Sequence, residues 1–227
     1  MSLIENFKFV FLEGNRYQYI IDGLQVTLGV SIVSVLVGTL LGLILAIMKM
    51  TEVRKGKKTI FSVIAGIYID VIRGTPSLLQ LLIMYFVVFR SQFGIVAAIL
   101  SFGINSGAYV AEIIRAGIMA VDKGQMEGGR SVGLSYGMTM RHIIIPQAVK
   151  NILPALGNEF IQLIKETSIL GYIAIYDLTK AASYITSRTY QMFLPLIGCA
   201  VIYYLIIKTL TVLLGKLERN MRKNDTH

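Results

Sequence analysis

An apolar run extends from Ile20 to Met48, and its one charged residue is Asp22, near the beginning. A helix needs about 20 apolar residues to cross the hydrocarbon core of a bilayer, so this run can span a membrane. Gly38 and Gly42 form a G-x-x-x-G spacing, which allows helix backbones to approach closely. Four more candidate spans follow, at about Pro76–Phe89, Phe93–Met119, Ala148–Ile169 and Met192–Leu214. The sequence therefore predicts an all-α integral membrane protein with about five transmembrane helices.

Composition supports a membrane location. Hydrophobic residues make up 55% of the chain, charged residues 15%, and the mean hydropathy is +0.66. Soluble domains carry about 25% charged residues, so most of this surface must meet lipid or other subunits, which excludes disorder and a soluble nucleic-acid-binding domain. The single cysteine, Cys199, excludes an internal disulfide framework, and the two histidines, His142 and His227, are too few for a histidine-rich metal site.

The basic residues predict an orientation. The formal net charge is +9, from 22 lysines and arginines against 13 acidic residues. In a five-span topology thirteen of the basic residues fall on one side, in residues 49–58, 121–141 and 208–223, and six on the other, with three near span ends left uncounted. Cytoplasmic loops carry the excess of lysine and arginine, so we expect the N-terminus outside and the C-terminus in the cytoplasm.

The apolar stretch at residues 59–89 is broken at residues 70–76, where proline favours a new helix start. Asp70 and Arg73 lie three positions apart near this break, and Glu112 and Arg115 have the same spacing in the third span. Residues three apart are neighbours on a helix surface, so each pair can form an ion pair. Because both pairs lie near predicted cytoplasmic span ends, we expect them to hold helix ends or an inner gate rather than to contact substrate.

The longest internal loop, residues 121–145, has the capping pattern of two short helices. Asp122 is expected to cap a helix through Glu127–Val132, and Ser135 a second helix through Tyr136–His142. Such a helical pair could simply close the loop as an amphipathic surface hairpin, or it could dock another subunit. The capping pattern does not distinguish between these two alternatives.

The loop resembles the EAA motif of binding-protein-dependent ABC importer permeases, which reads Glu-Ala-Ala, three residues, Gly, nine residues and Ile-x-Leu-Pro. This chain has Glu127-Gly128-Gly129, then Gly133, then Ile143–Pro146 at those positions. It departs from the motif where the two alanines are glycines and where Ile145 replaces leucine. Glycine is about 1 kcal/mol less favourable than alanine in a helix, so we expect a less rigid first helix.

Other motifs resemble those of the polar amino acid permeases, the His/Glu/Gln/Arg/opine group, and the resemblance covers about residues 16–220. These motifs are Arg73–Pro76, Gly107–Tyr109, Glu112, Arg115–Ile118, Gly124-Gln125 and Lys165–Ser168. The resemblance implies a type I ABC importer permease fold in a single domain, residues 1–227. It also implies that residues 121–146 form a cytoplasmic coupling loop that seats in an ATPase subunit. The implied coupling residues are Glu127, Gly128, Gly129, Arg130, Gly133, Arg141 and Pro146.

The same resemblance implies the partners of a bacterial cytoplasmic-membrane protein: two copies of an ATP-binding cassette subunit, a second permease subunit in a homodimer or paired heterodimer, and an external substrate-binding protein. The sequence contains no G-x-x-x-x-G-K-[ST] phosphate-binding loop. We therefore expect this chain to be no enzyme and to bind no cofactor, with ATP and Mg²⁺ held by the partner ATPase.

Polar residues near the middle of the predicted fourth span are candidate substrate ligands. Asn158, Glu159 and Gln162 share much of one helical face, and no lysine or arginine lies three or four positions from Glu159. Charged groups at this depth usually face a bundle interior or an aqueous cavity. In the third span Asn105 and Ser106 lie among small residues that could open a cavity. We expect these five residues to contact a polar, basic amino acid; the alternative is a packing role, with Glu159 protonated or paired with a cation from another helix.

Two other classes of protein are considered. An ion-coupled secondary amino acid transporter or channel is typically built from internal repeats, but no repeat is clear and five spans do not divide into halves. A membrane-embedded enzyme needs clustered catalytic groups, whereas the histidines and the cysteine lie far apart in the sequence. We therefore predict the transmembrane subunit of an ATP-driven amino acid importer that works by alternating access.

Overall fold

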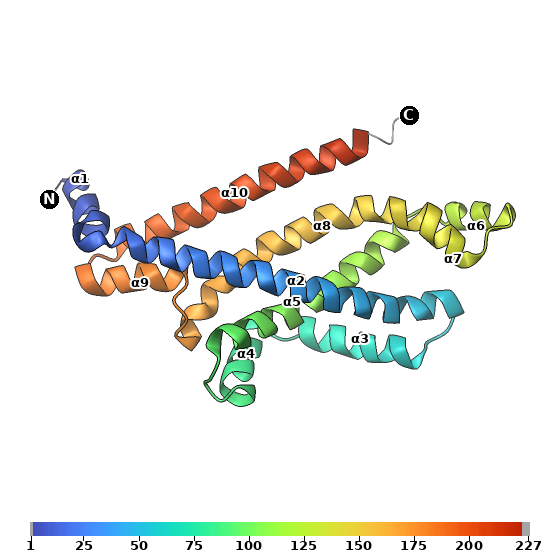
Figure 1. Ribbon diagram of the computed structural model, residues 1–227, viewed down its shortest axis with the longest axis horizontal. Helices are drawn as coiled ribbons and strands as arrows, with labels where there is room; N and C mark the ends of the chain where they lie inside the picture. The colour runs from blue at the N-terminus through green and yellow to red at the C-terminus, as the bar shows by residue number, and fades with distance from the viewer. Residues whose placement is uncertain (1, 224–227) are drawn as a thin grey trace. The chain divides into compact units, whose positions relative to one another are not determined.

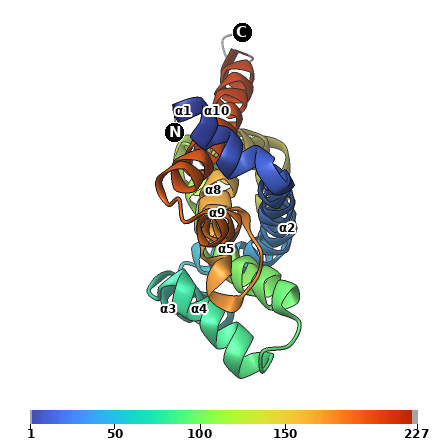
Figure 2. The same ribbon diagram turned by 90° about the vertical axis from the view of Figure 1, so that its left-hand side faces the viewer.

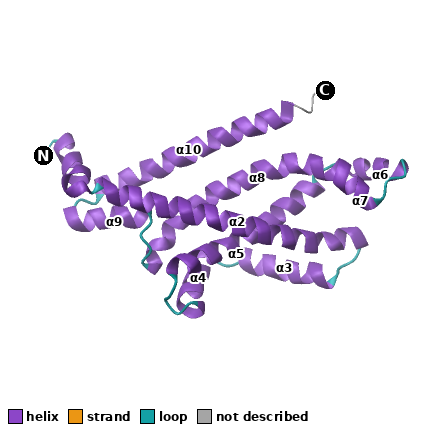
Figure 3. Cartoon of the chain, viewed as in Figure 1, coloured by secondary structure: helices purple, strands orange, loops and turns teal. Residues whose placement is uncertain are grey.

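The computed structural model describes residues 2–223, and within this range the chain is helical with no β-strand (Figure 3). The helices seen in Figure 1 are α1 (Leu3–Phe7), η1 (Lys8–Leu12), η2 (Glu13–Asn15), α2 (Tyr17–Lys55), α3 (Ile60–Arg73), α4 (Ser77–Leu82), η3 (Ile83–Val88), α5 (Gly94–Met119), α6 (Lys123–Ser131), α7 (Tyr136–Thr139), η4 (Met140–Ile144), α8 (Ile145–Glu166), η5 (Thr167–Ile173), α9 (Leu178–Thr189) and α10 (Phe193–Lys223). This architecture confirms the predicted all-α fold.

Among residues 2–223, three helical segments are long and apolar enough to cross a membrane: Tyr17–Val53, Gly94–Met119 and Phe193–Met221. Helix α3 together with α4 and η3 passes the same test as one broken span, which raises the number to four. Helix α8 contains most of the predicted fourth span but is not among these segments. Five spans and the orientation of the chain therefore stay predictions.

The contacts divide the chain into two compact units, each assembled from separate stretches of sequence. The first contains the described residues up to Leu36, Thr75–Gly103 and Phe160–Leu210; the second contains Val37–Gly74, Ile104–Glu159 and the described residues from Thr211. The long helices α2, α5, α8 and α10 each contribute to both units. The single-domain assignment of residues 1–227 stays a prediction.

The first unit has two apolar clusters. One joins α2, α4, α5, α8 and η5, with Leu81, Phe102 and Leu163 buried in it. The other packs α9 against η1 and the beginnings of α2 and α10, with Leu178 and Ile185 fully buried (Figure 2). Burying this apolar surface fixes α9 beside the N-terminal segment.

A buried aspartate sets the start of α9. Asp177 is fully buried at the N-cap, where its carboxylate accepts the backbone N–H groups of Thr179 and Lys180 at 3.1 and 3.0 Å. The backbone N–H of Leu178, the first residue of α9, donates to Thr27 Oγ1 of α2 at 3.1 Å. Burial raises the pKa of the Asp177 carboxyl, while the two capping hydrogen bonds act against this rise. The cap thus joins α9 to α2 through satisfied polar groups.

The second unit is held by a close crossing of α2 and α5. A Cβ atom on Gly42 would lie 2.5 Å from Val110 Cγ1, and one on Gly107 would lie 3.0 Å from Leu41 Cδ2. Helix α3 packs on the same pair, and Tyr68 Oη donates to the Ile104 carbonyl at 2.8 Å. The close approach predicted from the G-x-x-x-G spacing is therefore present at its second glycine.

Candidate functional site

Helix α6 forms the first part of the predicted coupling loop, within the second unit (Figure 1). Asp122 caps it as predicted, its Oδ1 accepting the Gly124 N–H at 2.7 Å. The helix begins at Lys123, directly after this cap, and ends before Gly133, whose φ of +89° is in the left-handed region that favours glycine. The side chain of Glu127 is exposed, so it is accessible to a partner.

The two glycines that depart from the EAA motif have different surroundings. Gly129 is buried, and a Cβ atom there would lie 2.5 Å from Thr139 Cγ2 and 3.1 Å from Ile143 Cδ1. A Cβ atom on Gly128 would meet open space, with no neighbouring heavy atom within 4 Å. Gly129 therefore allows α6 to approach the second short helix closely, so glycine here serves packing as well as lowering intrinsic helix propensity.

The second short helix begins as predicted but does not end where we expected. Ser135 caps α7, its Oγ accepting the Met138 N–H at 3.3 Å. Helix α7 then continues through the π-helix η4 directly into α8, with Pro146 as the second residue of α8. The predicted end of this short helix at His142 is therefore wrong. Proline lacks an N–H and its ring crowds the preceding turn, and the wider π turn before it accommodates this within one continuous helix.

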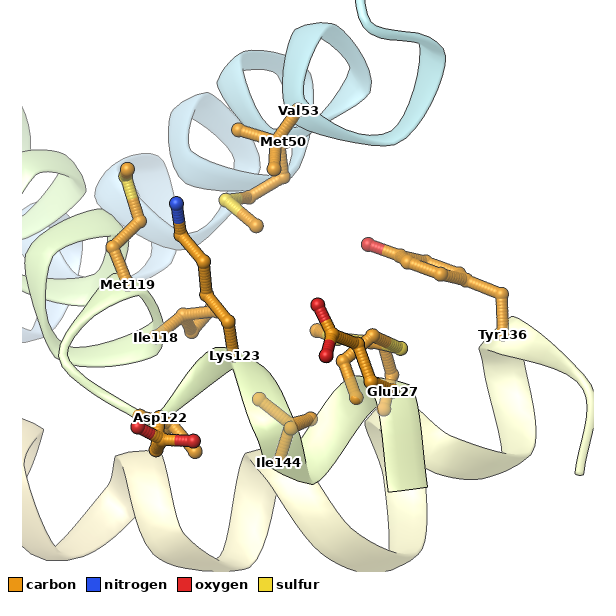
Figure 4. Close-up of a pocket in the computed structure, with 12 residues that line it drawn as sticks. Met50, Val53, Ile118, Met119, Asp122, Lys123, Glu127, Tyr136 and Ile144 are labelled. Carbon is orange, nitrogen blue, oxygen red and sulfur yellow. The ribbon is translucent and has the colours of Figure 1, made fainter. Parts of the chain in front are cut away.

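A cavity of about 350 Å³ lies where α6 and α7 approach the ends of α2 and α5, all in the second unit. Four methionines line it: Met50, Met119, Met126 and Met140. Figure 4 shows the Glu127 carboxylate and the Tyr136 hydroxyl directed toward the open space, with Lys123 on the opposite side. Sequence reasoning missed this cavity, because its lining comes from four separate helical segments and no local pattern marks it.

Of the two predicted charged pairs, one forms. Arg115 donates to both carboxylate oxygens of Glu112, with Nη2 2.8 Å from Oε2. The expected Asp70–Arg73 pair is absent from the ion pairs of residues 2–223. The Arg73 guanidinium lies instead over the Tyr109 ring, 5.1 Å from its centroid, where a cation–π contact takes the place of the ion pair.

The candidate substrate residues lie on α5 and α8. Asn158 and Gln162 are exposed and Glu159 is half-buried, while Asn105 and Ser106 are buried in α5. Gln162 Nε2 donates to Glu166 Oε1 at 3.3 Å. The Ser106 hydroxyl is buried and has no hydrogen-bond partner among the described residues. The grouping of these five residues in one pocket stays a prediction.

The small residues of the third span leave no open space at Gly107. There the Leu41 side chain of α2 fills the space. Small residues permit close helix contact as readily as they leave space. Which of these occurs depends on the neighbouring helix.

The fold and the loop together define a helical membrane protein with a helical hairpin built on the EAA pattern. The model of the family described as "Binding-protein-dependent transport system inner membrane component" matches residues 22–223, so the chain belongs to this family. It is 40% identical over 213 residues to the arginine transport system permease protein ArtQ of Bacillus subtilis (strain 168), covering 91% of this chain and 94% of ArtQ. It is 38% identical over 210 residues, with the same coverage, to a GlnP permease protein of Rickettsia typhi whose name assigns it to glutamine transport.

Solved structures of ABC transporter chains have the same fold as this chain. A chain of an amino acid ABC transporter crystallised with histidines is 47% identical, with a TM-score of 0.83, and the match covers 92% of this chain and 98% of that chain. The MetNI methionine ABC transporter in an inward-facing conformation shares the fold, at 17% identity and a TM-score of 0.73 over 90% of this chain and 96% of that one.

This protein is therefore an inner-membrane permease subunit of an amino acid ABC transporter, with the type I importer fold. It is not an enzyme, since a separate ATPase subunit hydrolyses ATP. Membership of the family implies an ATPase, a substrate-binding protein and a second permease subunit as partners. It also displaces the alternative of an ion-coupled transporter or channel.

Proposed function

We propose that this subunit carries basic amino acids, and that Glu159 supplies the negative charge that selects them. The observation that carries the proposal is a half-buried carboxylate in the middle of α8, between the exposed amides of Asn158 and Gln162. A carboxylate in a partly buried site attracts a cationic side chain and disfavours an acidic one. The similarity to ArtQ supports an arginine-like substrate, whereas the similarity to GlnP makes glutamine the competing candidate.

The polarity of α8 supports its place along the pathway. This helix has 22 residues, about 33 Å of length, which is enough to cross the hydrocarbon core. It is not among the helices that are long and apolar enough to cross a membrane. A helix of that length with exposed polar side chains needs water or protein around it. Asn105 and Ser106 would complete the polar lining from α5.

Replacing Glu159 tests the substrate. Glu159→Gln keeps size and hydrogen bonding but removes the charge, so it should weaken an ion pair worth about 1.5–3 kcal/mol. Arginine uptake by the reconstituted complex should then need roughly ten- to a hundredfold more substrate, while glutamine uptake changes less. Glu52→Gln is the matched control, since it makes the same change at a half-buried carboxylate of α2 outside the proposed site. Equal losses for arginine and glutamine, with lower complex stability, would assign Glu159 to packing.

We infer that the α6–α7 loop docks the ATPase subunit, with one loop seated in each of two ATPase copies. Glu127, Arg130 and Arg141 are exposed on it and can form polar contacts, while Gly133 allows the turn between the two short helices. The four methionines that line the cavity beside this loop are unbranched and adapt to small shifts. This arrangement suits a loop that moves with its partner.

Two substitutions in the loop test whether it docks the ATPase subunit. Glu127→Lys reverses an exposed charge, and Gly133→Asp places a side chain at a φ of +89°. Both should lower the yield of ATPase subunit co-purified with the permease and reduce transport-linked ATP hydrolysis. Glu13→Lys, an exposed reversal predicted on the opposite side of the membrane, is the control. Normal yield and normal stimulated hydrolysis in both loop variants would refute the docking assignment.

A further inference from the structure

Helix α3 has one packed face and one exposed apolar face. Ala65 and Ile69 are buried against α2 and α5. On the other side the exposed fractions are 77% for Ile60, 53% for Ile64 and 61% for Ile67, at spacings that place the three on one line along the helix. The 14 residues of α3 extend about 21 Å, which without α4 and η3 is too short to cross about 30 Å of hydrocarbon. Because α3 follows the turn after the long apolar helix α2, we place the start of the stripe near one membrane surface.

Positive charge gathers at the start of this stripe. Lys55, Lys57 and Lys58 are all exposed in the turn between α2 and α3. The nearest acidic residue along the chain is the half-buried Glu52, and the first turn of α3 has no acidic residue. The lysines therefore place an uncompensated positive charge beside an apolar surface.

The turn that carries the lysines is tied to both helices. Thr59 Oγ1 accepts the Ser62 N–H at 3.1 Å, and Ser62 Oγ accepts the Thr59 N–H at 3.0 Å, which forms a capping box. The hydroxyls of Thr59 and Thr51 are hydrogen-bonded to each other, which joins the turn to α2. Gly56 has a φ of +65°, which glycine adopts without strain. The backbone of the turn thus holds the lysines at a fixed place beside the stripe.

We propose that the α2–α3 turn and the exposed stripe of α3 bind an anionic phospholipid of the cytoplasmic leaflet. The ammonium groups of Lys55, Lys57 and Lys58 face the headgroup phosphate, while the isoleucine stripe contacts the acyl chains. Basic residues beside an anionic leaflet and an apolar helical face at the interface are the two chemical requirements for such binding. A second copy of the chain fits less well, because its three lysines would repel these three across a symmetric contact.

The test compares lipid binding to the intact permease–ATPase complex in detergent, titrated with phosphatidylglycerol or phosphatidylcholine and followed by native mass spectrometry. The variant replaces Lys55, Lys57 and Lys58 by glutamine; the control replaces the exposed Lys208, Lys216 and Arg219 of α10 in the same way. Each lysine near an anionic surface contributes about fivefold, so the turn variant should bind phosphatidylglycerol at least roughly tenfold more weakly. The control should keep its preference for phosphatidylglycerol, and phosphatidylcholine binding should not change.

Equal phosphatidylglycerol binding by the turn variant and wild type, or equal losses in variant and control, would overturn the proposal. A second measurement does not depend on the lysine variant folding. An Ile64→Cys chain with Cys199→Ser, labelled with a nitroxide in nanodiscs, should be relaxed by oxygen dissolved in the lipid. Protection from oxygen, or a disulfide formed between two copies through this cysteine, would show that protein covers the stripe and would also overturn the proposal.

Discussion

Gly128 and Gly129 are neighbours in α6 with opposite surroundings, so alanine at each should have opposite effects. At Gly128 the added Cβ meets open space, and the gain is the usual helix preference of alanine, about 0.5–1 kcal/mol. At Gly129 the Cβ would lie 2.5 Å from Thr139 Cγ2, and overpacking of this kind costs about 1–3 kcal/mol. After subtraction of the helix gain, Gly129→Ala should lose about 1 kcal/mol, and at most about 2.5 kcal/mol.

The assay is hydrogen exchange of the α6 amides in the purified complex, which reports local opening of this helix. Since about 1.4 kcal/mol corresponds to a factor of ten, Gly129→Ala should speed exchange by roughly fivefold and by at most about sixtyfold, whereas Gly128→Ala should slow it. Adding Thr139→Ser to Gly129→Ala removes the clashing methyl group. It also keeps the hydroxyl, which in the wild type donates to the Ser135 carbonyl at 3.0 Å.

That double variant should recover most of the lost protection. Equal exchange in the two alanine variants, or no recovery with Thr139→Ser, would refute the close packing of α6 on α7. The prediction concerns stability of the loop alone. It can therefore hold whether or not the loop docks the ATPase.

Two other predictions follow from the fold and the topology. Asp177→Ala removes the buried cap of α9 and should lower stability by about 1 kcal/mol, whereas Asp177→Asn should keep most of it; equal melting temperatures for the two variants would contradict the capping role. Cysteines at Lys57 or Lys123 in a cysteine-free chain should react only from the cytoplasm, and cysteines at Glu13 or Ser187 only from outside. Labelling of any one of these from the wrong side would refute the five-span topology.

Local signals predicted the coupling loop well because caps depend on residues close in sequence. Asp122 and Ser135 both cap the helices predicted for them, and Gly133 lies where a left-handed residue is needed. What the sequence did not show is that α7 continues into α8 through Pro146. A proline near a helix start and a proline after a π turn have the same local pattern, so periodicity does not separate them.

The wrong predictions concern contacts that a partner helix decides. The spacing of Asp70 and Arg73 permits an ion pair, but Tyr109 from α5 offers the guanidinium an alternative that is invisible in the local sequence. Glu112 and Arg115 have the same spacing and do pair. In the same way, Leu41 fills the space at Gly107. Sequence spacing shows which contacts are available, and tertiary packing selects among them.

Helices α8 and α10 expose surfaces of opposite polarity, so they need different surroundings. The apolar window of α10 is only 6% buried, so lipid or another apolar surface must cover it. Helix α8 instead exposes Asn158, Gln162 and Lys165, which lipid solvates poorly. Water or protein must therefore lie against α8, and a polar pathway shared with a second permease subunit would meet this demand. The polarity of α8 is thus consistent with the second permease subunit that family membership implies.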